Sequence, residues 1–534
     1  MMRRHRHIAL LLLAGFVCLY LFTASWELPL AGDSGVMLRD AAWLLHHGVV
    51  ATRPDGTPAL SKYGLGQALV ELPVALLPQQ AVKAGVMHDR VLWLLVLSGL
   101  PAVLGALTNL LLLLIGLRLG YRPATAVALA LLSGLTTMIW PYTQTLFADP
   151  TLGVLWLVTF YALLRYRDSG HRDWLATASL TVMFAVMTKI MALAVVGIFG
   201  LYTLHLVSQR ARGGQGRGWS RPLVAFTVPA MAIGCAILWY NWVRYGTPLD
   251  VGYAADRDGR FGFNAPLLVG LFGLLLSPGK GVFWYNPTLL LGLLGIRGAW
   301  RRHRPETLVC VTLLAVNVLL YAKWWAWHGD WAWGPRYLVG SVPFGLLCAA
   351  PAIEKLLAWC AAPTWRAYAW RLLGTLLLVV GIGVQVAGLV VPYDRYLKLL
   401  LDKAPVFAAG VYQPEHWPIR DDTVHGHFIP EFSPLVGHLW MARCILHRDS
   451  PKGAVLRQAP PWAGLNPEWV PRNYNVHTVF HWNVWWMFLW QYESVWAERS
   501  WDAYTLAACL GAASLLLLAG AGWMAARLPP SLGP

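Results

Sequence analysis

Two short polar motifs follow the first apolar stretch of the chain, and both carry side chains suited to proton-transfer or phosphate chemistry. Gly32-Asp33-Ser34 comes soon after the apolar residues 8–26, and Ser61-Lys62-Tyr63-Gly64 follows further along the same polar segment. A carboxylate such as Asp33 can accept the proton of an attacking hydroxyl group. An ammonium group such as that of Lys62 can stabilise a negatively charged leaving group. Because charged side chains beside a membrane span are costly to keep, these motifs predict a functional site at the membrane surface.

Later segments carry side chains that suit the same chemistry. Three further cations that could act together with Lys62 are Lys189, Lys280 and Arg336. The guanidinium group of Arg336 can bind two phosphate oxygens at once. The side chains that we predict to contact the rest of a substrate are Asp149, Tyr63, Tyr142, Trp327, His328 and Asp330. The aromatic members of this set offer flat faces on which a ligand can stack.

Each of these assignments has a structural alternative that the sequence leaves open. Asp33 and Asp149 both precede helical stretches, where an aspartate is a good N-cap. The lysines could extend toward lipid headgroups, and Arg336 could anchor the end of a helix. The tryptophans of residues 324–333 could form a belt at the membrane interface.

The composition indicates a membrane protein. Of the 534 residues, 57% are hydrophobic, only 13% are charged and 30 are tryptophan, a profile with too little polar surface for a soluble domain. The formal net charge of +16 is concentrated at the N-terminus and in short loops that alternate with loops poor in lysine and arginine, which is the positive-inside pattern. We find no basic groove with interleaved aromatic residues, so we predict membrane lipids and no nucleic acid as partners.

Hydropathy and charge predict an all-α polytopic protein with about twelve transmembrane helices and both termini in the cytoplasm. The predicted spans are residues 8–26, 90–117, 124–140, 150–164, 174–187, 190–208, 222–243, 281–299, 307–325, 337–353, 372–391 and 503–524. A long external loop, 27–89, contains two amphipathic stretches, 34–46 and 63–77, which predict helices lying on the bilayer. Residues 1–391 would form the transmembrane core, 392–499 an external segment with an interfacial helix, and 500–534 the last span and a cytoplasmic tail.

The order of these motifs resembles that of the GT-C glycosyltransferases, in particular bacterial relatives of the aminoarabinose and protein-mannosyl transferases. The matching pieces are Gly32-Asp33-Ser34, Ser61-Lys62-Tyr63-Gly64, Leu146-Phe147-Ala148-Asp149-Pro150, Lys189, Ser277-Pro278-Gly279-Lys280-Gly281 and Trp333-Gly334-Pro335-Arg336-Tyr337. The resemblance covers residues 1 to about 391. Many relatives carry an acidic pair in the first loop where this chain has Asp33-Ser34, which weakens the case for a metal there.

The resemblance implies a hexosyl- or pentosyltransferase with a polyprenyl-phosphate sugar as donor and a cell-envelope glycan, lipid or protein as acceptor. The active site would lie on the external face of the cytoplasmic (inner) membrane, where nucleotide sugars are absent. One displacement needs one base, so we predict inversion with Asp33 as the general base and Lys62, Lys189, Lys280 and Arg336 on the donor phosphate. A transporter or flippase for lipid-linked sugars is the alternative, although it usually has repeated halves, and an envelope assembly scaffold is a third reading.

One polar cluster near the C-terminal end raises the question of a metal. It contains Asp421, Asp422, His425, His427, Glu431 and His438. The pair His425 and His427 has no matching second pair at a spacing typical of zinc sites. We therefore predict neither a metal site nor a cofactor, and expect acceptor contact or loop packing for this cluster.

Overall fold

The structure is a computed structural model that describes residues 2–27, 32–49, 60–83, 90–213, 219–252, 262–329, 332–359, 363–403, 427–461, 476–492 and 500–528. Regular structure in these ranges is helical, apart from one isolated antiparallel bridge between Ser25 and Val484. The predicted all-α fold is therefore confirmed.

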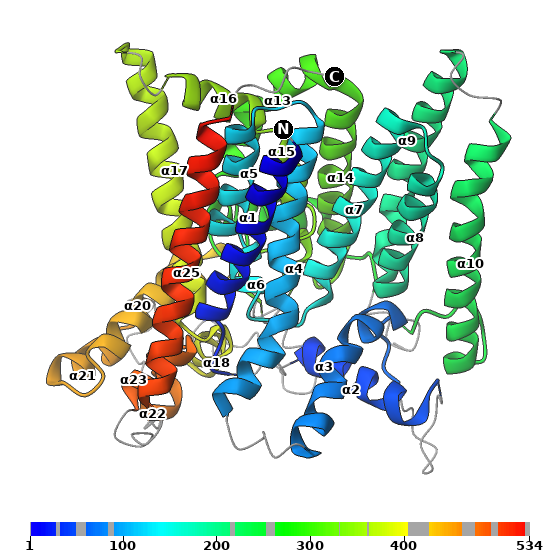
Figure 1. Cartoon of the computed structure of the whole chain (residues 1–534). Helices are drawn as coiled ribbons and strands as arrows, with labels where there is room; N and C mark the ends of the chain where they lie inside the picture. Colours follow the sequence, from blue (N-terminus) through cyan, green and yellow to red (C-terminus); the bar gives the residue numbers. More distant parts are fainter. Residues whose placement is uncertain are drawn as a thin grey trace.

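Long helices run side by side and form the body of the molecule (Figure 1). They are α1 (Met2–Phe22), α4 (Arg90–Arg118), α5 (Pro123–Thr136), α7 (Ala148–Ser169), α8 (Asp173–Thr188), α9 (Leu193–Arg212), α10 (Ser220–Tyr245), α14 (Arg304–Lys323), α17 (Trp365–Val390) and α25 (Ser500–Ala526). Among the described residues, seven helices are long and apolar enough to cross a membrane by length and composition. A helix satisfies its own backbone hydrogen bonds, which lipid cannot do, and this explains the architecture.

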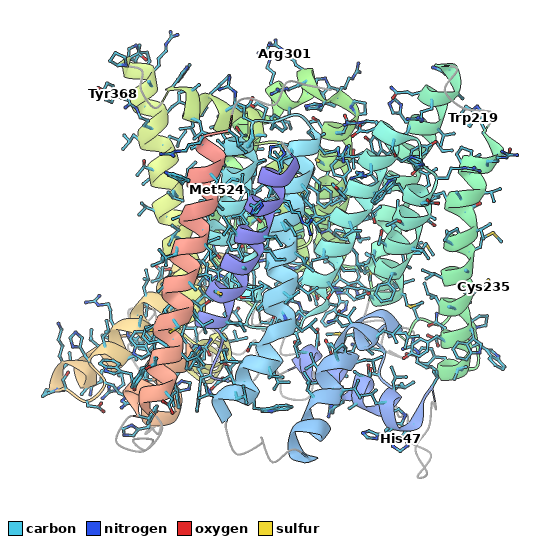
Figure 2. The ribbon with its side chains drawn as sticks, in the orientation of Figure 1. His47, Trp219, Cys235, Arg301, Tyr368 and Met524 are labelled. Carbon is cyan, nitrogen blue, oxygen red and sulfur yellow. The ribbon has the colours of Figure 1, made fainter. Side chains whose placement is uncertain are left out.

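The two ends of this bundle differ. Helix α1 begins and α25 ends at the same end (Figure 1), and Arg301 lies there, whereas His47 lies at the opposite end (Figure 2). At that opposite end α2 (Gly32–His47) and α3 (Leu65–Lys83) cross beneath the long helices. The two helices predicted in the first external loop are thus confirmed. Small side chains hold them together, since Ala41 of α2 is buried against Ala68 and Ala75 of α3.

Two predicted spans are replaced by several short helices, and a third, 124–140, is interrupted between the end of α5 at Thr136 and the start of α6 at Ile139. In place of 281–299 the chain forms α12 (Val282–Tyr285) and α13 (Leu289–Arg302), preceded by α11 (Leu267–Leu275) in a region predicted to be loop. In place of 337–353 it forms the short 3-10 helix η3 (Arg336–Leu338), α15 (Val342–Leu347) and α16 (Ala350–Ala358). Short 3-10 segments elsewhere include η2 (Ile190–Ala192), and α6 (Ile139–Tyr142) follows α5.

These short helices pack backbone against backbone, which explains why they are interrupted. A Cβ atom on Gly292 of α13 would lie 2.5 Å from the carbonyl oxygen of Gly345, and one on Gly295 would lie 2.2 Å from that of Cys348. Such close approach requires glycine at both α13 positions. Pro343 and Pro351 each stand near the start of one of the short helices, where a missing N–H costs nothing.

The described part of residues 392–499 contacts the bundle at the end that carries α2 and α3. Its helices are α18 (Tyr393–Lys403), η6 (Pro430–Phe432), α20 (Pro434–Leu446), α21 (Pro451–Gln458), α22 (Val476–Val479) and α23 (Trp485–Gln491). Backbone hydrogen bonds tie this part to the end of α1, because Trp26 donates to Asn483 over 2.6 Å and Trp485 donates to Ala24 over 3.1 Å. Asn483 in turn donates to the carbonyl of Val390, the last residue of α17, over 2.9 Å.

Candidate active site

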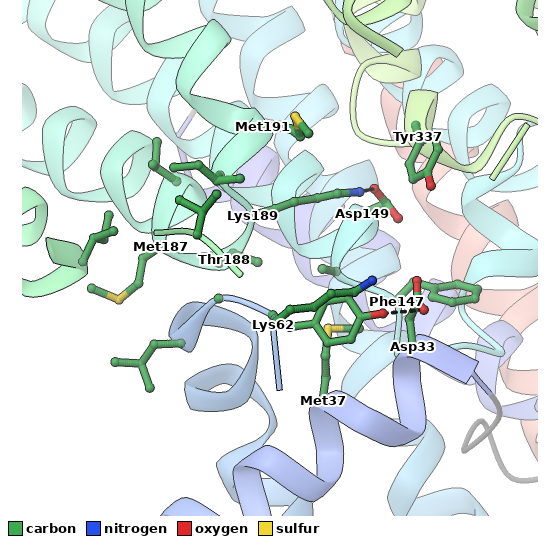
Figure 3. A pocket seen from close by; sticks show the side chains of 18 of the residues that line it. Asp33, Met37, Lys62, Phe147, Asp149, Met187, Thr188, Lys189, Met191 and Tyr337 are labelled. Carbon is green, nitrogen blue, oxygen red and sulfur yellow. Dashed lines mark hydrogen bonds and ion pairs between the residues drawn. The ribbon is translucent and has the colours of Figure 1, made fainter. Parts of the chain in front are cut away.

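A cavity of about 140 Å³ lies where α2 and α3 meet the ends of the long helices. Side chains from well-separated parts of the sequence line it (Figure 3). The residues predicted from the sequence that the structure brings together here are Asp33, Lys62, Tyr63, Asp149, Lys189 and Arg336. They include two carboxylates and three cations.

Asp33 lies in the first turn of α2, and its carboxylate contacts side chains from two other segments. One oxygen accepts a hydrogen bond from the Tyr63 hydroxyl over 2.5 Å, and the other lies 3.0 Å from Nη2 of Arg336. The side chain is 36% exposed, so it can be reached from solvent. Burial raises the pKa of this carboxyl, but Arg336, the Tyr63 hydroxyl, Lys189 and Lys62 together outweigh burial and hold the pKa below its ordinary value. Asp33 is therefore ionised at neutral pH.

Asp149 and Lys189 form a second ion pair in the cavity wall. Nζ of Lys189 lies 2.9 Å from the Asp149 carboxylate, and the same ammonium lies 4.4 Å from the ring centroid of Tyr337 and 5.2 Å from that of Tyr321. The two tyrosine rings stack on each other with centroids 4.2 Å apart. The N-cap position of α7 is occupied by Phe147, so Asp149 pairs with a cation instead of capping its helix.

Arg336, the cation of the first ion pair, is buried. Its Nη2 also donates to the Tyr337 hydroxyl over 3.2 Å, and its guanidinium lies 4.7 Å from the ring centroid of Phe147. Its Nε is buried and has no hydrogen-bond partner in the described part of the chain. A buried donor without a partner is costly, so Arg336 retains capacity to bind an anion.

Lys62 lies in a loop before α3, and both of its neighbours, Ser61 and Tyr63, form hydrogen bonds with side chains of α2. The Asp40 carboxylate accepts hydrogen bonds from the backbone N–H of Ser61, over 3.1 Å, and from its hydroxyl group. Tyr63 binds Asp33 as described above. Lys62 stands between these two held residues, and its side chain lines the cavity (Figure 3).

Arg244, at the end of α10, secures the same loop from outside, and the sequence analysis missed it. Its Nη1 donates to the carbonyl oxygens of Ser61 and Tyr63, in each case over 2.8 Å. The residue lines the cavity as well. The sequence shows only an arginine at the end of an apolar span, on the same side as Lys62. Its hydrogen bonds go to backbone carbonyl groups, which every residue has, so the sequence does not indicate the partners.

Two glycines allow this loop to approach α8 closely. A Cβ atom on Gly64 would lie 2.1 Å from the carbonyl oxygen of Met187, and one on Gly66 would lie 2.5 Å from the Thr188 hydroxyl. No other residue fits at such distances. The contact brings Lys62 and Lys189, which are far apart in the sequence, to the same cavity.

Four of the predicted site residues do not line this cavity. Lys280 is buried, and its Nζ donates to the carbonyl of Ala332 over 2.6 Å. The hydroxyl group of Tyr142 donates to the carbonyl of Trp333 over 2.9 Å. Trp327 and His328 are buried in the core, where both rings contact His427. Asp330 lies outside the described residues.

The tryptophan-rich turn is also internal for the most part. Trp324, Trp327 and Trp333 are buried in one hydrophobic cluster, so these three do not form the interfacial belt that the sequence left open. Trp324 and Trp325 line the cavity and offer aromatic surface beside the ion pairs.

The described residues contain no group of three or more side chains arranged to hold a metal ion. The Asp33 and Asp149 carboxylates are each paired with a cation. In the C-terminal cluster, Asp421, Asp422 and His425 lie outside the described residues, and Nδ1 of His438 bonds to the carbonyl of Ala387 over 2.8 Å.

Comparisons with known proteins give fold neighbours at low similarity. No protein-family model matches the chain, and no curated protein matches its sequence. The structure is similar to that of ArnT from Cupriavidus metallidurans in the apo state, with 14% identity, a TM-score of 0.47 and coverage of 85% of this chain and 72% of ArnT. It is also similar to ArnT from the same organism bound to undecaprenyl phosphate, with 14% identity, a TM-score of 0.43 and coverage of 97% and 77%. Because both TM-scores lie below 0.5, the function of this chain has to be inferred from its own residues.

Proposed function

We propose that the chain is an integral-membrane glycosyltransferase of the GT-C type that moves a hexose or pentose from a polyprenyl phosphate to a hydroxyl group of a cell-envelope acceptor. The observation that carries this proposal is the meeting of Lys62, Lys189 and Arg336 with the Asp33 carboxylate in one cavity at the end of the long helices. The phosphate of a membrane lipid lies at the bilayer surface, where membrane-spanning helices end. A protein that binds this phosphate needs fixed cations there.

The three cations suit the phosphate of the donor. Charge develops on that phosphate as the bond to the sugar breaks, and preorganised cations in a partly buried site stabilise it. Arg336 would bind phosphate oxygens through the part of its fork that the protein leaves unbonded. The apolar residues Val186, Met191 and Ile237 also line the cavity and suit the start of an isoprenoid chain.

Asp33 would act as the base. It is ionised, partly exposed and held by the Tyr63 hydroxyl. The acceptor oxygen forms a bond to the anomeric carbon, the bond from that carbon to the phosphate oxygen breaks, and the phosphate leaves with the electron pair. The acceptor proton passes to Asp33. One displacement of this kind inverts the anomeric centre.

The charge distribution supports an external site on the cytoplasmic membrane. Basic residues of short loops, such as Arg118 at the end of α4 and Arg301 near the end of α13, lie at the end of the bundle opposite to the cavity. Basic loops stay in the cytoplasm, which would place the cavity on the external face and both termini inside.

The test uses the purified full chain in proteoliposomes with a radiolabelled polyprenyl-phosphate sugar and extracted envelope glycolipid or glycan as acceptor. We expect Asp33→Asn to lower turnover by roughly 10²–10⁴-fold, since it removes a general base. Asp173→Asn is the matched control, because Asp173 is an exposed aspartate in the first turn of α8 at the other end. Normal turnover in folded Asp33→Asn protein would contradict the mechanism. Movement of the lipid-linked sugar across the vesicle with no new glycosidic bond would favour a transporter.

A further inference from the structure

Helix α20 has apolar side chains on both of its faces. The inner face packs Trp440, Met441 and Cys444 into a hydrophobic cluster with α18. On the outer face Val436, Leu439 and Leu446 are 42%, 60% and 65% exposed. A helix with one face in water normally places polar side chains there, so this outer face is suited to something other than water.

Helix α20 lies beside a candidate membrane span. Helix α20 packs against α17, whose outward side chains Leu376 and Val379 are exposed along a candidate span. Figure 1 shows α20 leaving the bundle obliquely at the end that carries α2 and α3, with α21 beyond the edge of α17. Helix α20 thus begins beside α17 and extends outward at the level where the bundle ends.

The same segment is basic, although it lies at the end of the bundle away from the basic loops. Between residues 434 and 458 the only acidic side chain is Asp449, and Arg448 pairs with it at 3.1 Å. Arg443 lies on the outer face between Leu439 and Leu446, and Lys452 is exposed at the start of α21. Basic side chains beside an apolar face are typical of helices that lie in the headgroup layer of a bilayer with anionic lipids.

We propose that α20 and α21 form an interfacial platform that lies in the headgroup layer of the leaflet at the cavity end. Val436, Leu439 and Leu446 enter the acyl boundary, while Arg443 and Lys452 bind anionic phospholipid headgroups. A second copy of the chain fits less well, because a symmetric contact over this narrow stripe would bring two Arg443 side chains together in an apolar interface. The platform does not depend on sugar transfer.

The first test measures depth in the bilayer. A nitroxide is attached at Leu439→Cys or Leu446→Cys, in a full chain whose exposed Cys235 and Cys509 are replaced by serine, in phosphatidylcholine vesicles containing phosphatidylglycerol. We expect both labels to collide readily with oxygen and to be shielded several-fold from a water-soluble nickel chelate. The matched control is Asp449→Cys, which is exposed on the same segment and should show the reverse.

Three results would overturn the platform. A label at Leu439 as accessible to nickel as the one at Asp449 would place the outer face in water. Shielding from both oxygen and nickel would indicate a protein partner. Dipolar broadening between labels on two chains would indicate a contact between copies.

The second test addresses the headgroups. Arg443→Glu combined with Lys452→Glu should raise the nickel accessibility of the Leu439 label several-fold in vesicles with phosphatidylglycerol, and should have less effect in phosphatidylcholine alone. Arg301→Glu, at the opposite end of the bundle, is the charge-matched control and should leave the label where it is. An equal effect in both lipids, or none, would contradict binding of anionic headgroups.

Discussion

Two groups of ion pairs lie at opposite ends of the helix bundle, and they use similar side chains. At the far end Glu306 accepts from Arg167 over 2.9 Å and from the Tyr202 hydroxyl over 2.8 Å. Arg167 also donates through Nε to Asp168 and through Nη2 to the carbonyl of Arg118. Every nitrogen of Arg167 therefore has an acceptor, and this group ties α7, α9 and α14 together.

The group at the cavity end is less completely paired. Arg336 has a buried Nε without a hydrogen-bond partner in the described structure, and the group lines an open cavity. The residue types do not separate the two groups, since each contains arginine, a carboxylate and tyrosine. What separates them is the unused donor of Arg336 and the cavity beside it, which our proposal assigns to the binding of an anion.

The largest expected difference in turnover is between two arginine-to-lysine variants, one at the cavity end and one at the far end of the bundle. Arg336→Lys keeps the charge but removes the fork, so we expect turnover with a polyprenyl-phosphate sugar to fall by roughly 10²–10³-fold, the usual cost of losing a donor to developing charge. Arg167→Lys should leave turnover per folded molecule unchanged and lower the thermal unfolding temperature. Equal losses of turnover in the two variants would remove the distinction between the ends.

Removal of the carboxylate at the far end should affect stability alone. Glu306→Gln weakens two hydrogen bonds to a charged group, and such bonds contribute about 1.5–3 kcal/mol each. Thermal unfolding in detergent and turnover of the remaining folded protein measure the two quantities separately. A fall in turnover without a fall in stability would mean that the far-end group takes part in function.

The next effect concerns Arg244, which acts on Lys62 through the backbone. Arg244→Ala frees the carbonyls of Ser61 and Tyr63 and should raise the KM for the donor by about tenfold, the equivalent of roughly 1.4 kcal/mol, with a smaller change in kcat. Arg244→Lys should recover part of the loss, because a single ammonium can still reach one carbonyl. A fall in kcat alone would indicate direct participation in the reaction.

Charge and hydropathy in the sequence assigned the candidate cations to one end of the bundle. They did not predict which side chains each cation contacts. Charge and hydropathy fix the depth of a residue in the membrane, so Lys62, Lys189, Lys280 and Arg336 were all assigned to one face. Depth does not fix lateral position, and Lys280 instead bonds to Ala332 inside the core. The division of spans 281–299 and 337–353 into short helices was not predicted for a related reason. Hydropathy does not register backbone contacts such as that of Gly292 with Gly345.

The smallest expected effects are shifts of the acid limb in the pH profile of kcat/KM. The pKa of Asp33 lies below its ordinary value of about 3.9, so the base stays ionised as pH falls until that depressed value is reached. The ion pair with Arg336 likewise stabilises the fold above the ordinary pKa and loses its effect as pH falls through the depressed one. The native chain should therefore show a flat profile across neutral pH.

Arg336→Gln removes the strongest of the influences that lower this pKa, so the pKa should rise and the acid limb should move to higher pH. Tyr63→Phe removes one hydrogen bond and leaves the arginine in place, so it should move the limb in the same direction by less. Residual turnover of both variants, measured against the native profile, gives the two shifts. A limb that stays in place in Arg336→Gln would show that a group other than Asp33 accepts the proton, and the cavity end would then differ from the far end in anion binding alone.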